Sequence, residues 1–467
     1  MLSAVDDSDE SDMNPTAIDW WSAAASHLVQ LESLGMIPGA HSPLKPKLAI
    51  PFPPPIKASA IADNNEQEVL VTPVDIGKRP SLPLLRPTPV IITKARPGGG
   101  GNELPSLNVT DLSSAAWCET QWLFTRTYGR SRAALACLGL VPDEEAREVQ
   151  QRGRNIHAVL EVATNGKKVT VAAYHKDDKL ALRFLESILG FYTLLTKGIT
   201  RELPVRGIVT HHASGRQFMI WGIIDQLEIV DGPDGSTIIT LTDHKTRRVN
   251  ALPPSTQREG TWMQLATYAV LLRDALAGLQ DPAALAEAMG AVGNEPLGTE
   301  VQAYIRASSR LSGLIFPHGP PPSTQSKTPT GSLPPVRRPP PRNKRRIGNG
   351  RTTSVTPETS CATLLDVMQA HHVVAASFFD NVCISPNAMA KYIFQETGQE
   401  IGELVYPLLL VEKYEQRLQD FLGMILGQRT PAGVDDVEQA HLKCGNCEYA
   451  PVCAWRDDKV REMQRAK

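Results

Sequence analysis

The 467-residue sequence lacks several features that would assign it to a large class of proteins at once. It has no apolar run of the roughly 18 residues that a membrane span needs, and no secretory h-region follows Met1. Its formal net charge is only −2, so any contact with nucleic acid must come from a local patch. It has no G-x-x-x-x-G-K-[ST] phosphate loop, so ATP-driven unwinding would need a partner. We expect a soluble, intracellular protein that binds no membrane.

The 37 prolines are concentrated near the start and around residues 317–341, so much of the length is expected to be non-globular. Residues 1–105 are predicted to be a disordered, Pro-rich arm. Within it, residues 17–34 could form an amphipathic helix that docks through Trp20 and Trp21, or one that is merely nascent. Residues 317–356 contain no acidic residue and are predicted to be a disordered basic insertion, which is either a nuclear-localisation or nucleic-acid patch or a solvated linker.

The most informative stretch is WGIIDQLEIVDGPDGSTIITLTDHKTR, residues 221–247. It predicts two strands, 221–230 and 236–247, joined by the turn formers DGPDG. If Val230 faces Ser236 across the turn, Asp225 lies opposite Leu241. Because side chains alternate with period two, Asp225, Asp243 and Lys245 then project from one face of the hairpin.

Two carboxylates on adjacent strands repel each other unless a cation lies between them. Mg²⁺ suits one or two carboxylates together with phosphate oxygens, and a Lys two residues after the second Asp can orient a water or stabilise charge on a phosphate. The D…D-x-K pattern therefore indicates a metal-dependent phosphodiesterase. The alternative is a solvated hairpin face with an ordinary cross-strand ion pair.

A helix is predicted over residues 142–162, and it carries His157 and Glu161 on one face. Beside the hairpin carboxylates, His157 is a candidate metal ligand or phosphate contact, although a helical His is more often a packed or surface residue. Glu202, in the strand-like sequence before the hairpin, could line the same edge of the sheet.

A second helix with strong periodicity is predicted over residues 261–276. Its Gln264 and Tyr268 are also spaced i, i+4 and share a face. They could hydrogen-bond a nucleic-acid backbone near the scissile phosphate, or they could simply be half-buried polar residues of a core helix.

Near the C-terminus, Cys444, Cys447 and Cys453 form a C-x₂-C-x₅-C pattern, which in an intracellular protein points to a metal rather than to disulfides. A fourth Cys or His would complete a zinc site, and a [4Fe–4S] cluster would need a fourth Cys. Cys118, at the start of the ordered core, is the best candidate. A shared site would then tie together the two ends of the core. The remaining cysteines, Cys137, Cys361 and Cys383, are expected to be packing residues.

The sequence resembles the exonuclease V group (defects in morphology) of the PD-(D/E)XK, RecB-like nucleases. The resemblance extends over about residues 109–455 and rests on six motifs in order: WCETQ, RGRNIHAVLE, GIIDQLEI, TDHKTR, QLATYAVLL and the final C-x₂-C-x₅-C. It implies that Asp225 and Asp243 are Mg²⁺ ligands and Lys245 the catalytic lysine, that His157 is the helical His, and that Gln264 and Tyr268 are the QxxxY pair. By the same resemblance, the four candidate cysteines hold a [4Fe–4S] cluster: Cys118, Cys444, Cys447 and Cys453.

From this resemblance we expect an α/β fold of the restriction-endonuclease type, with a mixed central sheet flanked by helices. The expected parts are a nuclease core at 106–280, an insertion at 281–360, and a helical part at 361–467 that closes the domain through the cysteines. The expected activity is that of a Mg²⁺-dependent, single-stranded DNA exonuclease with 5′ preference and short oligonucleotide products.

The expected setting is DNA repair and genome maintenance in the nucleus or mitochondrion, as a monomer. The expected partner is single-stranded DNA, with a single-strand-binding protein or a helicase as further candidates. Two alternatives stay open: a zinc-stapled nucleic-acid-binding protein with an inactive nuclease core, or the nuclease subunit of a helicase complex.

Overall fold

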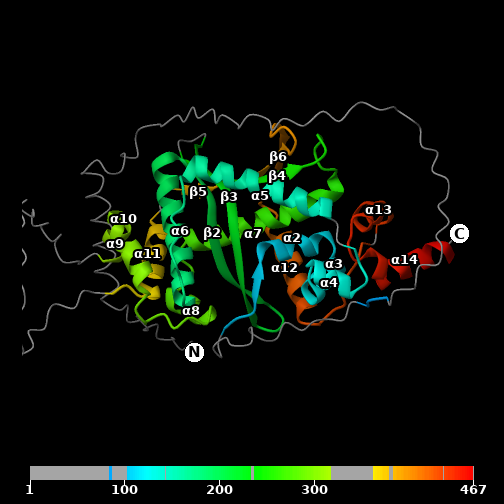
Figure 1. The fold of residues 1–467 in the computed structure, drawn as a ribbon, viewed down its shortest axis with the longest axis horizontal. Helices are drawn as coiled ribbons and strands as arrows, with labels where there is room; N and C mark the ends of the chain where they lie inside the picture. The colour runs from blue at the N-terminus through cyan, green and yellow to red at the C-terminus, as the bar shows by residue number, and fades with distance from the viewer. Residues whose placement is uncertain are drawn as a thin grey trace, which may run out of the picture.

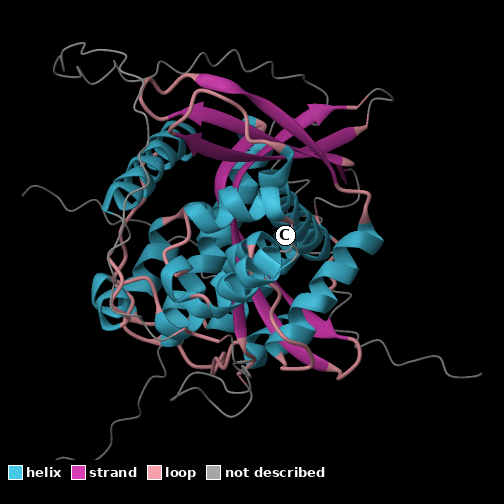
Figure 2. Cartoon of the chain, turned by 90° about the vertical axis from the view of Figure 1, so that its right-hand side faces the viewer, coloured by secondary structure: helices cyan, strands magenta, loops and turns pink. Residues whose placement is uncertain are grey.

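The computed structural model describes residues 84–86, 103–141, 144–232, 236–316, 361–377, 382–434 and 436–465. The helix expected at 17–34, most of the hairpin turn and the basic insertion lie outside the described residues. The described strands form one twisted, mixed layer with helices packed against it (Figures 1 and 2). No helix of this part of the chain is long and apolar enough to cross a membrane.

The seven-stranded sheet is built around β3 (Arg216–Asp231). β2 (Ile199–His211) runs antiparallel to it, while β1 (Ser106–Asn108) pairs in parallel with its first half and β4 (Thr237–Arg247) pairs antiparallel with its second half. On the far side of β4 lie β5 (Val382–Ile384) and β6 (Asn387–Phe394), both parallel to it, and then the antiparallel β7 (Glu400–Pro407). β4 thus lies inside the sheet, with neighbours on both sides.

The register of the central hairpin differs from the predicted one by two residues. Val230 faces Ile238 rather than Ser236, and Gln226 faces Thr242. A shift of two residues leaves every side chain on its predicted face, because the side-chain period of a strand is two. Extending the ladder by one residue puts Asp225 opposite Asp243, so the corrected register brings the two carboxylates closer than predicted.

Alternate residues of β3 enter two different hydrophobic clusters, as expected for a sheet covered on both faces. Phe218 and Ile220 pack with α2 (Val109–Trp117), α7 (Arg258–Leu276) and α12 (Val411–Ile425). Met219 and Trp221 pack with a second layer, formed by α6 (Lys176–Lys197), α8 (Pro282–Ala288), α9 (Thr299–Ala307), α10 (Ser309–Ile315) and α11 (Leu364–Ala376). Figure 1 shows α6 and α9 to α11 to the left of the strands, and α2 and α12 to their right.

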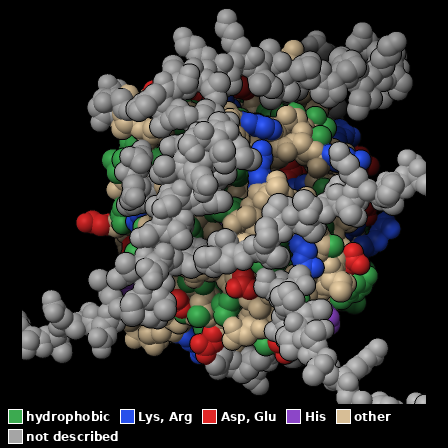
Figure 3. Space-filling model, turned by 90° about the vertical axis from the view of Figure 1, so that its left-hand side faces the viewer, with side chains coloured by type: hydrophobic (Ala, Val, Ile, Leu, Met, Phe, Trp, Pro, Cys, Tyr) green, Lys and Arg blue, Asp and Glu red, His purple; other side chains and the backbone are tan. Residues whose placement is uncertain are grey.

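The remaining helices lie at the margins of these layers. α5 (Glu144–Asn165) crosses β2 and β4, and η1 (Ser255–Gln257) precedes α7. A group at the right of Figure 1 comprises α3 (Glu119–Tyr128), α4 (Arg132–Cys137), α13 (Val437–Gly445), η3 (Ala450–Val452) and α14 (Ala454–Arg465). Charges of both signs are interspersed on the visible part of the left-hand face, which agrees with the near-zero net charge (Figure 3).

The predicted mixed sheet flanked by helices is confirmed. The prediction of a helical part from residue 361 onward was wrong for 382–407, which forms β5, β6 and β7. Its Ala, Lys, Met and Glu residues favour helix in isolation, but pairing with the free edge of β4 overrides that weak preference. Cys118 is extended and separates two helices, as the C-cap of α2 and the N-cap of α3.

Candidate functional site

The hairpin of β3 and β4 brings Asp225, Asp243 and Lys245 to one place, as the alternation pattern predicted. The Lys245 Nζ lies 2.9 Å from Asp243 Oδ2, and Asp225 Oδ2 accepts a 2.8 Å hydrogen bond from the backbone N–H of His244. Asp243 is almost fully buried, with 2% of its side chain exposed, whereas Lys245 retains 32%. Lys245 therefore both neutralises a buried carboxylate and reaches the surface where a substrate would arrive.

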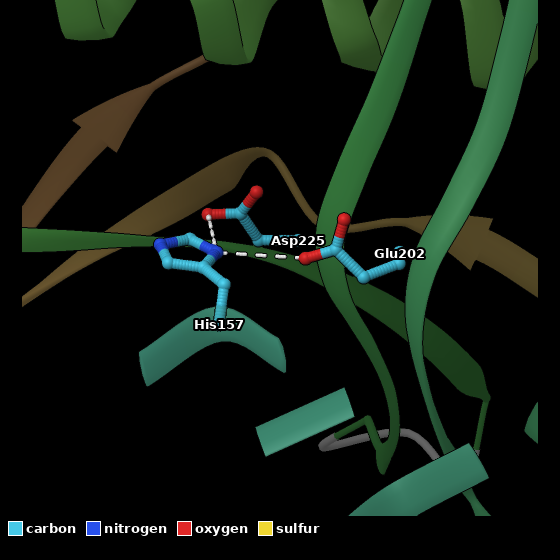
Figure 4. A group of neighbouring side chains, drawn as sticks. All are labelled: His157, Glu202 and Asp225. Atoms are coloured by element: carbon cyan, nitrogen blue, oxygen red, sulfur yellow. Dashed lines mark ion pairs between the residues drawn. The ribbon is translucent and has the colours of Figure 1, made fainter. Parts of the chain in front are cut away.

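His157 reaches the same site from α5. Its Nε2 lies 2.9 Å from the carbonyl oxygen of His244. A carbonyl can only accept, so Nε2 donates this bond, and Nδ1 is left facing two carboxylates. Nδ1 lies 3.5 Å from Glu202 Oε1 and 3.7 Å from Asp225 Oδ2, and both contacts converge on the one ring nitrogen (Figure 4).

His157, Glu202 and Asp225 could together hold a metal ion, because one ligand atom from each lies within 4.8 Å of the others. The ligand set predicted from the sequence had Asp243 in place of Glu202. The sequence alone placed Glu202 only at the edge of the sheet. Pairing of its strand with the strand of Asp225 is what makes Glu202 a candidate ligand. Among the described residues, Glu202 is also the one non-glycine residue with positive φ, at 51°, and such strain is often stored at functional sites.

Gln264 and Tyr268 of α7 support the hairpin side chains from the other side. The Oε1 of Gln264 accepts from Lys245 Nζ at 2.8 Å, and its Nε2 donates to Asp243 Oδ1 at 3.1 Å and to Tyr268 Oη at 3.2 Å. Gln264 thus braces Lys245 and Asp243, and the expected contact of Gln264 and Tyr268 with a nucleic-acid backbone stays a prediction. Gly222 leaves the space that the Tyr268 ring occupies, since a Cβ at residue 222 would lie 2.5 Å from Tyr268 Cε1.

The electrostatics of the site indicate an excess of negative charge. Burial, with repulsion from Asp243, raises the pKa of Asp225 to about 7, although His157 and Lys245 pull it down. The pKa of His157 is raised mainly by its contact with Glu202, against the opposing effect of burial. Burial lowers the pKa of Lys245, but Asp243 and Asp225 outweigh it and leave that pKa raised. The raised pKa values of Asp225 and His157 mean that both groups hold protons more tightly than usual, and a bound cation would offset the same negative charge.

The four predicted cysteine ligands line one small pocket. Cys118 lies at the α2–α3 junction, Cys444 in α13, Cys447 in the turn after it, and Cys453 after η3. Burial raises the pKa of Cys118 to about 12 and that of Cys447 to about 11, so their thiols keep their protons at neutral pH. The sulfur atoms are not drawn together as a metal site: the described residues contain no group of three or more cysteines whose Sγ atoms all lie within 4.8 Å of one another.

Protein contacts already bring the two ends of the core together around that pocket. Arg429 pairs with Glu119, and Thr120 N–H donates to the carbonyl of Ala432 at 3.1 Å. The hydroxyl of Tyr449 donates to the carbonyl of Gly129 at 2.7 Å. These contacts join the same two parts of the chain that the pocket cysteines come from.

The sequence matches the family model described as exonuclease V, a 5′ deoxyribonuclease, over residues 103–237 and 231–456. The chain belongs to the exonuclease V family. Exonuclease V of Danio rerio is 25% identical over 367 residues, which are 77% of this chain and 73% of the relative. The crystal structure of SSO0001 aligns with 76% of this chain and 88% of its own, at 12% identity and a TM-score of 0.31, a similarity too low to support an argument.

Membership of this family confirms the resemblance inferred from the motifs, and it points to a 5′ DNA exonuclease. The matched residues include the hairpin, α5, α7 and all four pocket cysteines.

Proposed function

We propose that the protein hydrolyses single-stranded DNA from a 5′ end with Mg²⁺ bound at His157, Glu202 and Asp225. The observation that carries this proposal is the convergence of a histidine nitrogen and two carboxylates on one point, next to the ion pair of Lys245 with the buried Asp243. The family supports the 5′ DNA exonuclease activity, and this geometry supports the metal.

The two carboxylates of Glu202 and Asp225 fit Mg²⁺, a hard cation that prefers carboxylate oxygens and keeps room for phosphate oxygens, while the imidazole of His157 is the less usual donor of the three. When bound, Mg²⁺ would supply positive charge that polarises the scissile phosphate and favours ionisation of the attacking water. The raised pKa of Asp225 supports the same conclusion, because a neighbouring cation would stabilise its carboxylate.

The other residues of the site act on the phosphate and on each other. Lys245 keeps its proton, since its pKa is raised, so it donates hydrogen bonds to a phosphate oxygen or to the water rather than acting as a base. Gln264 fixes the direction of Lys245 Nζ and one oxygen of Asp243 at the same time. Tyr268 in turn fixes the amide of Gln264.

We further propose that Cys118, Cys444, Cys447 and Cys453 hold a [4Fe–4S] cluster. Four cysteines around one pocket provide the donor set of such a cluster. A zinc ion would take the same four thiolates, so metal analysis has to distinguish the two.

The test is anaerobic purification with analysis of iron, sulfide and zinc, beside cleavage of 5′- and 3′-end-labelled single-stranded DNA with Mg²⁺ or EDTA. We expect about four irons per chain and Mg²⁺-dependent release of short products from the 5′ end. Asp243→Ala should abolish cleavage and leave DNA binding intact. Zinc without cleavage would refute both proposals, and persistent cleavage by Asp243→Ala would refute the assignment of the hairpin.

A further inference from the structure

The helix that carries His157 has little apolar attachment to the sheet. Along α5, the buried residues among those whose side chains are described are Gly153, Leu160 and Thr164, while Val159 and Val162 are 50% and 53% exposed. Apolar burial therefore restrains the helix only weakly, and its position over the strands must depend on polar contacts.

Gln395, the residue after β6, provides such a contact near the start of the helix. Its Nε2 donates to the carbonyl of Val149 at 3.1 Å and to Thr246 Oγ1 on β4 at 2.8 Å. Because the Val149 carbonyl can only accept, the orientation of the amide is settled by this pair of bonds. The backbone N–H of Gln395 donates to the carbonyl of Arg247 at 2.9 Å, so Gln395 itself is fixed to the end of β4.

The contacts of α5 with β4 follow one stripe of the helix. Val149, Gly153 and His157 are spaced four residues apart and lie on one face. A Cβ at Gly153 would lie 2.8 Å from Thr246 Oγ1, so the helix backbone packs directly on the Thr246 side chain there. One turn later, His157 reaches the carbonyl of His244. Four residues along the helix, from Gly153 to His157, thus correspond to two residues along the strand, from Thr246 to His244.

A second polar contact fixes the other end of α5. The Nδ2 of Asn165 donates to the carbonyl of Arg201 at 2.6 Å, directly before Glu202, and its Oδ1 accepts from Arg201 N–H at 3.2 Å. His157 therefore lies between two anchors, one on β2 beside Glu202 and one on β4 and β6 through Gln395. The distances from its Nδ1 to Glu202 and Asp225 depend on both anchors.

We propose that Gln395 is a positioning residue of the metal site. Its hydrogen bonds hold α5 in the position that brings His157 Nδ1 close to Glu202 and Asp225. The inference rests on the proposed function, since it concerns the same metal. Residues that orient metal ligands through hydrogen bonds typically change metal affinity by about 10- to 100-fold when they are replaced. Gln395 acts at a distance through the helix, so we expect an effect at the lower end of that range.

The test replaces Gln395 by Leu, which keeps much of its volume and removes both donated bonds. The Mg²⁺ concentration for half-maximal cleavage should rise about 10-fold, with a smaller change in the rate at saturating Mg²⁺. Gly153→Ala should shift it in the same direction, because the added Cβ pushes the helix away from Thr246. Gln399→Leu, in the exposed turn of the same β6–β7 hairpin, is the matched control and should leave the Mg²⁺ dependence unchanged.

Binding of Mn²⁺, measured by calorimetry without DNA, gives a readout that does not depend on cleavage. Mn²⁺ should bind about 10-fold more weakly to Gln395→Leu than to the wild type, and in a His157→Ala background Gln395→Leu should cause no further loss. A Gln395→Leu protein with lowered melting temperature but unchanged Mg²⁺ and Mn²⁺ dependence would overturn the inference. If the wild type itself bound no Mn²⁺ and cleaved no DNA, the proposed function would fail instead.

Discussion

Asp225→Asn should make the metal-free protein more stable while it abolishes cleavage. The change removes a buried negative charge that faces Asp243 and Glu202, and it keeps the shape of the side chain. The Oδ1 of the new Asn can still accept the hydrogen bond that Asp225 Oδ2 now accepts from His244 N–H at 2.8 Å. The amide in place of the other oxygen carries no charge, so the repulsion from Asp243 is removed. The variant loses a proposed ligand, so its Mg²⁺-dependent activity should disappear.

The size of the effect follows from the raised pKa. With a pKa of about 7 in the folded protein, against an ordinary value of 3.8, ionised Asp225 opposes folding. Each unit corresponds to about 1.4 kcal/mol, so the cost at pH 8 is at most about 4 kcal/mol. Because the folded-state pKa of this carboxyl is raised, the loss of folding stability depends on pH. It is absent below about pH 4, grows between about pH 4 and 7, and is complete above about pH 7. Side-chain rearrangement in the wild type relaxes part of the repulsion, so about 2 kcal/mol is a realistic gain.

The assay is thermal unfolding in EDTA at pH 5 and pH 8. A gain of about 2 kcal/mol corresponds to a rise in melting temperature of about 4 to 8 °C for a domain of 150 to 250 residues, and less for a longer chain. The rise in melting temperature should be clearly larger at pH 8 than at pH 5. Saturating Mg²⁺ should reduce the difference between variant and wild type, because it stabilises only the wild type. Asp231→Asn, at the exposed end of the same strand, is the control. An equal or lower melting temperature at pH 8, or a gain independent of pH, would refute the reasoning.

Three further changes test separate parts of the structure. Lys245→Met should lower the cleavage rate at least about 100-fold and also destabilise the protein, because it leaves the buried Asp243 without its ion pair. Because Lys245 also lowers the pKa of Asp225, which is about 7, the loss of stability should be larger at pH 9 than at pH 6, and a loss that falls with pH would contradict the ion pair. Gly222→Ala should cost about 1 to 3 kcal/mol in urea unfolding, because the new Cβ meets Tyr268 and Val109, and an unchanged midpoint would disprove the close packing. Cys447→Ser should lower iron content and melting temperature together. Cys383 is exposed on β5, so Cys383→Ser should change neither, and equal effects of the two substitutions would argue against the cluster.

The local motifs were predictable because each depends on contacts within one element. Alternation in the hairpin placed Asp225, Asp243 and Lys245 on one face, and that result survived an error of two residues in register because the error was even. Helical spacing placed Gln264 beside Tyr268 in α7. In both cases a short period in the sequence fixes the relative direction of side chains before any tertiary contact is made.

The parts that the sequence did not predict depend on contacts between distant segments. Glu202 becomes a candidate ligand only when β2 pairs with β3, and the sequence offers no period that joins the two. The strands β5 to β7 form because β4 has an edge to be covered, which is a property of the folded sheet rather than of residues 382–407. Gln395 was missed for the same reason, since its partners Val149 and Thr246 lie 246 and 149 residues away in the chain.

The position of β6 also changes what counts as the nuclease core. The expected core, residues 106–280, contains the proposed metal ligands, but Asp243 and Lys245 lie on a strand whose other neighbour is β6, with Ala390 opposite Asp243 and Tyr392 opposite Lys245. Without β6 the edge of β4 that carries both residues would be open to water, and the helix bearing His157 would lose its contact with Gln395. The segment after the basic insertion therefore supports the proposed metal site through β6, and its last part reaches the α2–α3 junction, where Cys444, Cys447 and Cys453 line one pocket with Cys118.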